Sequence, residues 1–465
     1  MPVFPASARE CGKITGESAQ PAPPQPESRL ATTEALFQPH LETVAGHFAR
    51  ALEAAGYDGA LIPSGEPPMQ FADDQPYPFK PNPRYRQWVP EATPGCLLAI
   101  QPGRRPLLLF RQESDYWHMP PATPEAAWTR AYDLRIVRDA SEACAALPSG
   151  RRWAWLGEPS AAWDGLGEPN PARVTASLDF QRAAKTPYEV ECLAAASRIG
   201  SRAHRAAEKA WRHGASEFEI HLEYCRAALA REEDLPYNSI VACNEHGAVL
   251  HYQRLDSSPP AQRRSFLIDA GAPFAGYGSD ITRTYAAAPG PFADLVAAVD
   301  AVERQLATLV TPGRDYRDIH LAAHRLVADV LADCGLVRLR GDDAVDAGLT
   351  RVFFPHGIGH LLGLQVHDVG GLMADETGAI RPRPEGHPFL RLTRDLGEGF
   401  VVTIEPGVYF IDLLLAEARA DRRSALIDWD AVEALRPFGG VRVEDNVVAL
   451  ADGPRNLTRE AFGTA

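Results

Sequence analysis

Short apolar runs alternate with Gly, Pro and charged residues over the first third of the chain. Five of them have the length and boundaries expected of strands: DGALIPSG (58–65), CLLAIQ (96–101), PLLLFR (106–111), LRIVRD (134–139) and WAWLGE (153–158). The connection QPGRR (101–105) predicts a hairpin between two of these strands. The segment FADDQPYPFKPNPRYRQWVP (71–90) is rich in Pro and aromatic residues, so we expect an ordered loop and no helix there.

Helical patterns begin after residue 180. Thr186, Pro187 and Glu189 form an N-cap, first-turn and capping-box signal before a long helix. Ser216 and Glu219 repeat the capping box. The helix that follows carries one apolar face made of Phe218, Leu222, Cys225 and Leu229. Two further helices are expected near 291–310 and 315–333, between strands in SFLIDAGA (265–272), ITRTYAAA (281–288), FVVTIEPGVYF (400–410) and GGVRVEDNVVAL (439–450).

Length and composition indicate a large globular α/β protein. The 465 residues are 45% hydrophobic, which is enough for a sizeable core in two or three domains. We expect a disordered tail over residues 1–35, an N-terminal α/β domain over 36–178 and a second unit over 179–465.

Charge and cysteine content narrow the class of protein. The net charge of −14 argues against nucleic acid and anionic membranes as partners. No apolar run reaches the roughly 18 residues of a membrane span, and the first thirty residues lack the apolar region of a secretory signal. Seven scattered cysteines without a CxxC motif are typical of reduced thiols, so we expect a cytoplasmic protein.

Four of the strand-like runs in the second unit carry an acid among apolar residues. These acids are Asp269, Asp280, Glu405 and Glu444. A carboxylate in such a strand either points to solvent or needs compensation if it is buried. Asp269 and Asp280 flank GAPFAGYG (271–278), whose Gly and Pro predict a hairpin that would bring both acids to one point.

A run with three histidines contains candidate nitrogen ligands. FFPHGIGHLLGLQVHDVGG (353–371) contains His356, His360 and His367 among glycines that allow close backbone approach. These histidines could be core residues, zinc ligands or an acid/base set. If His360 joins the four carboxylates, the set is oxygen-rich and favours Mn²⁺ over a thiolate-type zinc site. Four negative charges also suit two divalent ions, which can generate a hydroxide nucleophile and polarise a carbonyl.

In order and context these five residues resemble the metal ligands of the pita-bread metallopeptidases, which include methionine aminopeptidase, aminopeptidase P and prolidase. The resemblance extends to both domains, from about Leu36 to Arg459. It is strongest for bacterial Xaa-Pro dipeptidases (prolidases) and the closely similar organophosphorus acid anhydrolases. The motifs that carry it are DDQPYPFKPNP, DYWH, PYNSIVACNEHGAVLHY, SFLIDAGA, PHGIGHLLGLQVHDVGG, PEGHPFLRLTR, TIEPGVYFID and LRPFGGVRVEDN.

The resemblance implies a pita-bread catalytic domain over 179–465 and a two-metal hydrolase that cleaves Xaa-Pro dipeptides with a metal-bridging hydroxide. It implies that Asp269 holds one ion, that Asp280 and Glu444 bridge the two, and that His360 and Glu405 hold the second. Glu405 is also implied as the general base. The expected metal is Mn²⁺, with Co²⁺ or Zn²⁺ as alternatives.

The resemblance also implies roles for other residues of the site. His251 and His367 would contact the substrate carbonyl, while Arg391 would bind the C-terminal carboxylate of a dipeptide through its planar fork. Arg442 would orient ligands or substrate from the strand that carries Glu444. The substrate pocket would further include His356, Tyr237, Tyr409 and a lid residue, Asp74 or its neighbour Asp73, which reaches the other subunit of a homodimer.

Three other functions compete with the dipeptidase reading. Phosphotriester hydrolysis is one, because a tetrahedral phosphorus centre resembles the intermediate of amide hydrolysis. Aminopeptidase P activity on longer Xaa-Pro peptides is another, which a carboxylate clamp at Arg391 would disfavour. A metal-free binding scaffold is the third, although all five ligand positions are intact.

Overall fold

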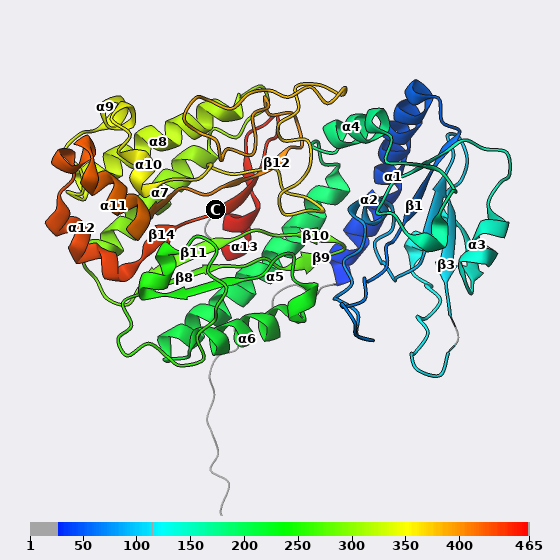
Figure 1. Cartoon of the computed structure of the whole chain (residues 1–465), viewed down its shortest axis with the longest axis horizontal. Helices are drawn as coiled ribbons and strands as arrows, with labels where there is room; N and C mark the ends of the chain where they lie inside the picture. Colours follow the sequence, from blue (N-terminus) through cyan, green and yellow to red (C-terminus); the bar gives the residue numbers. More distant parts are fainter. Residues whose placement is uncertain (1–26, 114, 464–465) are drawn as a thin grey trace, which may run out of the picture.

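The computed structural model describes residues 27–113 and 115–463, with side chains from residue 33 onward. Figure 1 shows two parts side by side: a smaller N-terminal part, coloured blue to cyan, and a larger part, coloured green to red. The tail predicted over residues 1–35 lies mostly outside the described residues. Within that range, helix α1 (Glu27–Ala55) has already begun.

One mixed sheet organises the N-terminal part. Its strand order is β4-β3-β2-β1-β5-β6, antiparallel where β2 pairs with β1 and β3, and parallel elsewhere. The strands are β1 (Gly59–Pro63), β2 (Leu97–Ile100), β3 (Leu107–Arg111), β4 (Asp133–Val137), β5 (Trp153–Trp155) and β6 (Glu168–Pro169). The predicted hairpin between β2 and β3 is therefore confirmed. Helices α1, α3 (Ala140–Ala146) and α4 (Ala172–Gln181) accompany the sheet, and Phe48 and Leu52 of α1 join its buried core.

The segment 71–90 was expected to contain no helix, and this expectation was wrong. Helix α2 (Pro83–Trp88) lies at its C-terminal end. The Asn82 side chain accepts a hydrogen bond from the backbone of Arg84 at 2.9 Å, and Pro83 occupies the first turn. An Asn-Pro pair is a good helix start, and the surrounding prolines obscured it.

The larger part consists of short strands between pairs of helices. Figure 1 shows α5 and α6 on one side of the strands and α7 and α8 on the other. These helices are α5 (Pro187–Arg212), α6 (Glu217–Ala228), α7 (Pro291–Ala307) and α8 (Tyr316–Asp333). Shorter helices follow: α9 (Gly341–Asp346), α10 (Thr350–Phe353), α11 (Asp412–Ala420), α12 (Trp429–Leu435) and α13 (Leu457–Phe462).

The strands of this part form small antiparallel sheets joined by single bridges. One sheet has the order β11-β8-β7, another β12-β15-β16, and two pairs are β13-β14 and β10-β9. Their bounds are β7 (Ile240–Cys243), β8 (Ser265–Asp269), β9 (Pro273–Phe274), β10 (Tyr277–Gly278), β11 (Thr282–Ala286), β12 (Val401–Ile404), β13 (Gly407–Tyr409), β14 (Gly440–Arg442), β15 (Asp445–Val448) and β16 (Arg455–Asn456). A bridge between Thr282 and Glu444 connects the first sheet to the C-terminal strands.

Both predicted capping boxes are present. The side chain and backbone of Thr186 exchange hydrogen bonds with Glu189 at the start of α5, and Ser216 does the same with Glu219 at the start of α6. The face expected to be buried on α6 is different, however. Phe218 and Leu222 are about half exposed, whereas Ile220 and Tyr224 are buried. Apolar periodicity did not identify this face, because it also includes Glu217. The Glu217 carboxylate is buried and accepts hydrogen bonds from Cys243 N and the Tyr252 hydroxyl.

The two C-terminal strand runs are each interrupted at an acid. The run 400–410 divides into β12 and β13 around Glu405 and Pro406, and the run 439–450 divides into β14 and β15 around Glu444. Pro406 has no N–H to donate to a ladder. Glu405 and Glu444 therefore lie between strands and not within them, and both are residues of the candidate site. In the described part of the chain, no helix combines the length and apolarity needed to cross a membrane.

Candidate active site

The predicted site residues gather around one cavity in the larger part of the molecule. Its volume is about 830 Å³. Among the residues that line it are Tyr237, His251, Asp269, Asp280, His356, His360, His367, Arg391, Glu405, Arg442 and Glu444. These come from segments spread over more than two hundred positions, so folding brings them together.

Asp269 and Asp280 meet through the predicted hairpin. Strands β8 and β11 pair antiparallel with Thr282 opposite Asp269, which places Asp280 beside it. The hydroxyl of Tyr237 lies 2.7 Å from Asp269 Oδ1 and 2.6 Å from Asp280 Oδ1. One phenol proton therefore serves two carboxylates, and Tyr237 fixes their spacing.

His360 presents one ring nitrogen to the acids. Its Nδ1 lies 2.9 Å from the carbonyl oxygen of Leu361, so a proton on Nδ1 leaves Nε2 as a lone-pair donor. Nε2 lies 3.4 Å from Asp280 Oδ2 and 3.7 Å from Glu405 Oε1. One ligand atom from each of Asp280, His360 and Glu444 lies within 4.8 Å of the others. The close backbone approach expected of the glycines is present at Gly359, where a Cβ atom would lie 2.1 Å from the carbonyl oxygen of Thr403.

Arg442 and Thr282 make hydrogen bonds to two of the acids, Asp269 and Glu444. The guanidinium of Arg442 donates to Asp269 Oδ2 at 2.6 Å and to Thr282 Oγ1 at 3.1 Å. Thr282 in turn donates to Glu444 Oε2 at 2.7 Å. Arg442 thus supplies one positive charge to a set of four carboxylates.

Burial perturbs these carboxylates strongly. It raises the pKa of Glu405 to about 7 and the pKa of Glu444 well above its usual range, where the charges of Asp280 and Glu405 add to the rise. Burial also raises the pKa of Asp269, against the opposing charge of Arg442. For Asp280, burial is outweighed by the neighbouring His360, and its pKa is lowered.

This donor set fits divalent cations. Buried carboxylates are stable when they are paired, hydrogen-bonded or bound to metal, and here the protein's own cations do not balance the charge. Carboxylate oxygens with one imidazole form a hard set of the kind that suits Mn²⁺ and similar ions. The residues that could hold such ions are Asp269, Asp280, His360, Glu405 and Glu444.

The three histidines of the run 353–371 take different positions. His360 faces the acids. The ring of His367 meets the His360 ring edge to face at 4.5 Å, and burial followed by the charges of His360 and Arg391 lowers the pKa of His367 to about 4. His356 lies in the cavity wall, with Nε2 2.8 Å from the Tyr409 hydroxyl and Nδ1 3.6 Å from Glu405 Oε2.

Two predicted substrate-binding residues lie outside the cavity lining. Tyr409 is fully buried, and its hydroxyl accepts from Arg442 at 2.9 Å behind His356. It supports the wall and does not present itself to a ligand. Asp74 lies exposed in the N-terminal part, beside Asp73, whose Oδ1 accepts from the backbone of Asp74 and Gln75. Neither aspartate belongs to the residues that line this chain's own cavity.

Sequence reasoning missed two threonines of the site. Thr282 links Arg442 to Glu444, and Thr403 donates to Glu405 Oε1 at 3.4 Å and accepts from the backbone of His360 at 3.1 Å. Each stands two positions from a ligand, Asp280 or Glu405. Positions i and i+2 of a strand share a face, so this spacing is the signal that could have identified both.

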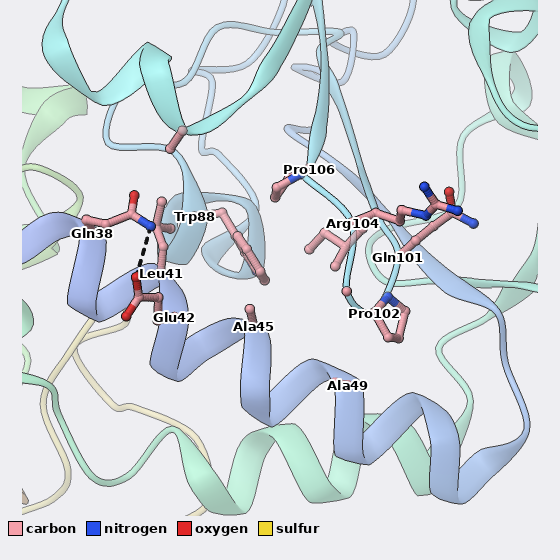
Figure 2. A pocket seen from close by; sticks show the side chains of 13 residues that line it. Gln38, Leu41, Glu42, Ala45, Ala49, Trp88, Gln101, Pro102, Arg104 and Pro106 are labelled. Atoms are coloured by element: carbon pink, nitrogen blue, oxygen red, sulfur yellow. Dashed lines mark hydrogen bonds between the residues drawn. The ribbon is translucent and has the colours of Figure 1, made fainter.

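A much smaller pocket, of about 140 Å³, lies in the N-terminal part (Figure 2). It is bounded by α1 and the turn after β2, with Trp88 in its wall. Its ionisable lining residues are Glu42, which accepts from Gln38 at 3.2 Å, and Arg104. It lacks the converging acids and histidines of the large cavity.

Comparison with known proteins assigns both parts of the chain. Residues 191–450 match the model of metallopeptidase family M24, and residues 35–180 match the model of the N-terminal domain of Xaa-Pro dipeptidase. A Xaa-Pro dipeptidase of Xanthomonas euvesicatoria pv. vesicatoria is 46% identical over 95% of this chain and 100% of its own length. One of Stenotrophomonas maltophilia is 46% identical over 93% of this chain and 98% of its own length.

Solved structures share the fold at low identity. The aminopeptidase PepP of Pseudomonas aeruginosa superposes with a TM-score of 0.70 at 22% identity, covering 93% of this chain and 96% of that one. Escherichia coli aminopeptidase P with the inhibitor Pro-Leu gives a TM-score of 0.68 at 22% identity, covering 92% and 95%. Together with the family models, these structures confirm the expected architecture of a small α/β domain followed by a pita-bread catalytic domain.

Proposed function

Because the chain belongs to metallopeptidase family M24, among its Xaa-Pro dipeptidases, we propose that it hydrolyses Xaa-Pro dipeptides with two divalent metal ions. The observation that carries the proposal is one cavity that is lined by four carboxylates, His360 and Arg391. The ions would be held by Asp269, Asp280, His360, Glu405 and Glu444. When bound, they lower the pKa of a water molecule and polarise a carbonyl group. The oxygen-rich donor set favours Mn²⁺, with Co²⁺ and Zn²⁺ as the alternatives.

Glu405 is the proposed general base. Burial raises the pKa of this carboxyl to about 7 in the metal-free protein. A carboxylate that lines the cavity is placed to accept a proton from a water molecule held there. Its oxygens lie near His360 and His356, which keep the side chain directed at the cavity. Arg442 and Tyr237 act on the reaction by holding Asp269 and Asp280 in place.

His251 and His367 are proposed to contact the substrate carbonyl. Both line the cavity, and the low pKa of His367, about 4, keeps that imidazole neutral at working pH. A neutral imidazole can donate one N–H to the carbonyl oxygen and stabilise the negative charge that develops there. His356 closes the wall beside them.

Arg391 is proposed to select dipeptides. It is exposed on the cavity lining, so its guanidinium is accessible to a ligand. A C-terminal carboxylate is the substrate group that matches its planar, bidentate fork. A longer peptide has an amide at that position, so it would leave the arginine without its partner.

The assay that tests the proposal compares Leu-Pro, a Leu-Pro-Gly tripeptide and a fluorophosphate on Mn²⁺-loaded protein. A dipeptidase releases proline from Leu-Pro with the highest kcat/KM of the three. Preference for the tripeptide would support the aminopeptidase P reading, and preference for the fluorophosphate would support phosphotriester hydrolysis.

We also propose a homodimer in which the loop with Asp74 approaches the partner's cavity. Support comes from the same loop, where the Phe71 side chain is 98% exposed and Met69 is 56% exposed. Large exposed apolar side chains are typical of contact surfaces when they cluster. Sedimentation of the intact protein tests this: a monomer at assay concentration would contradict it.

The cysteines support a reducing compartment such as the cytoplasm. The described ones, Cys96, Cys144, Cys192, Cys225, Cys243 and Cys334, are free thiols. The net charge of −14 supports a small-molecule substrate and no nucleic-acid partner.

A further inference from the structure

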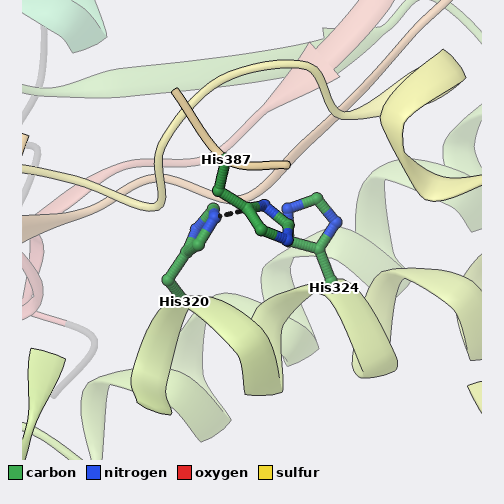
Figure 3. A group of neighbouring side chains, drawn as sticks. All are labelled: His320, His324 and His387. Carbon is green, nitrogen blue, oxygen red and sulfur yellow. Dashed lines mark hydrogen bonds between the residues drawn. The ribbon is translucent and has the colours of Figure 1, made fainter. Parts of the chain in front are cut away.

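Three buried histidines face one another outside the active-site cavity. Figure 3 shows His320 and His324 on α8 and His387 on the loop opposite, with the three rings turned toward one another. His320 and His324 are 1% exposed and His387 is 9% exposed. The spacing i, i+4 puts the first two on the same face of the helix.

Their nitrogens converge closely enough for one cation. One ring nitrogen from each histidine lies within 4.8 Å of the others. His320 Nε2 and His387 Nδ1 are 2.9 Å apart. A tetrahedral ion with metal–nitrogen bonds of about 2.0–2.1 Å separates its ligand nitrogens by roughly 3.3 Å. The 2.9 Å pair is slightly closer than this and no separation exceeds 4.8 Å, so the three rings would rotate to enclose an ion.

One nitrogen of the cluster is buried without a partner. His324 Nδ1 lies 2.9 Å from the hydroxyl of Thr350, while His324 Nε2 makes no hydrogen bond among the described residues. Leaving a buried polar atom unpaired is costly, and each such atom in a folded protein asks for an explanation. A proton on Nδ1, directed to Thr350, would leave Nε2 as a lone pair, in the manner of a metal-ligating imidazole held by an outer partner.

The imidazoles are neutral at physiological pH. Burial, with the charges of neighbouring histidines, lowers the pKa of His320 to about 2. Burial, with the charges of His387 and Arg351, lowers the pKa of His324 to about 3. Burial also lowers the pKa of His387. Protons therefore do not compete with a cation for these nitrogens near neutral pH.

One hydrogen bond must change for an ion to bind. The backbone N–H of Ile358 donates to His320 Nδ1 at 3.3 Å, which puts the His320 proton on Nε2, facing His387. To coordinate through Nε2, His320 must carry its proton on Nδ1 and give up the bond to Ile358. That bond is long at 3.3 Å, but its loss leaves the buried Ile358 N–H without this partner, a cost that the metal–nitrogen bonds must exceed.

We propose that His320, His324 and His387 form a Zn²⁺ site separate from the acidic site of the proposed reaction. An all-imidazole set suits Zn²⁺, whereas the carboxylate-rich set suits Mn²⁺. Three protein ligands leave the fourth position to water. The ion links α8 to the loop of His387. Because His387 is four residues before Arg391, the ion also restrains the segment that carries the proposed carboxylate-binding residue.

Zinc counting tests the site independently of catalysis. The full-length protein with Asp280→Asn and Glu444→Gln, which weakens the acidic site, is stripped, loaded with Zn²⁺ and desalted, and zinc per chain is measured by mass spectrometry. We expect about one Zn²⁺ per chain, reduced at least tenfold in occupancy when His324→Ala is added. His221→Ala is the matched control, because His221 is also buried on a helix with an unpartnered Nδ1.

A zinc content unchanged by His324→Ala, or equally reduced by His221→Ala, overturns the proposal. Circular dichroism checks that each variant is folded. Crystals of the unaltered protein soaked in Zn²⁺ supply a second measurement that needs no variant. Anomalous density between the three imidazoles supports the site, and density confined to the acidic cavity contradicts it.

Discussion

Buried carboxylates at two places in this molecule have opposite pKa shifts. Asp368, one residue after His367, contacts the guanidinium of Arg182 and lies 2.8 Å from Lys185 Nζ. Although burial alone would raise its pKa, these two cations lower the pKa to about 2. In the acidic cavity, by contrast, burial raises the pKa of Glu405 to about 7 and that of Glu444 well above its usual range.

The difference separates structural acids from candidate ligands. Asp368 has two protein cations for one carboxylate, so it has no need of an added ion and serves to anchor the segment that presents His367. The four acids of the cavity, by contrast, share the single positive charge of Arg442, which contacts Asp269. In the cavity, burial raises the pKa values of Asp269, Glu405 and Glu444, which therefore gain from a divalent ion. The pKa of Asp280 is lowered by His360, which is itself a proposed ligand. The sequence identified the four cavity acids among apolar neighbours and did not single out Asp368, so the difference between them is visible only in their surroundings.

The largest effect is expected at Glu405. Glu405→Gln keeps the shape of the side chain but removes a general base and a metal oxygen, so kcat for Leu-Pro should fall by about 10²–10⁴. Steady-state kinetics with saturating Mn²⁺ measures this. A variant that keeps more than about a tenth of the kcat would remove Glu405 from its proposed role.

Stability should respond oppositely in the two groups. Asp368→Asn leaves Arg182 and Lys185 buried without their partner and should cost about 3–5 kcal/mol of unfolding free energy. Glu444→Gln in metal-free protein relieves repulsion and should leave that free energy unchanged or higher. Urea unfolding of both variants after metal removal gives the comparison. Equal losses from the two substitutions would show that the two groups do not differ as described.

Arg391→Ala should raise KM for Leu-Pro roughly ten- to hundredfold, as expected when a charged hydrogen bond worth about 1.5–3 kcal/mol is lost. Its content of bound metal should not change. Arg383→Ala is the matched control, because Arg383 lines the same cavity but its Nε donates to the Leu390 carbonyl at 2.6 Å. A larger rise in KM from Arg383→Ala than from Arg391→Ala would indicate that Arg383 binds the substrate carboxylate.

The smallest expected effect is a pH dependence of the Asp368 contribution. The pKa of Asp368 is about 2 in the folded protein against an ordinary value of 3.8. A lowered carboxyl pKa stabilises the fold fully above 3.8, and this contribution is lost as the pH falls toward 2. The difference in urea midpoint between the wild type and Asp368→Asn should therefore be constant from pH 8 to 5 and shrink below 3.8. A difference that shrinks already between pH 8 and 5 would contradict the assignment.

The sequence predicted the elements around the site well because local signals were strong there. The capping boxes at Thr186 and Ser216 and the hairpin that brings Asp269 to Asp280 depend on neighbouring residues. The helix at Pro83–Trp88 was missed because surrounding prolines hid its Asn82 cap. The buried face of α6 was mispredicted because Glu217 is buried for its hydrogen bonds, which apolar periodicity does not register.

The site was predicted as a set of residues but not as an arrangement. Which acids have protein cations depends on contacts between distant segments, such as Arg442 with Asp269 and Arg182 with Asp368. The same holds for the histidine cluster, because His387 approaches α8 only through the path of its loop. Patterns of neighbouring residues in the sequence do not predict contacts between segments that are far apart along the chain.

Metal dependence of proline release tests the central claim most directly. The protein is stripped with chelator, titrated with Mn²⁺, and assayed for free proline from Leu-Pro at each step. The account predicts negligible activity in the stripped protein and a rise that levels off near two ions per chain. Full activity in the stripped protein, or none after loading, would contradict it.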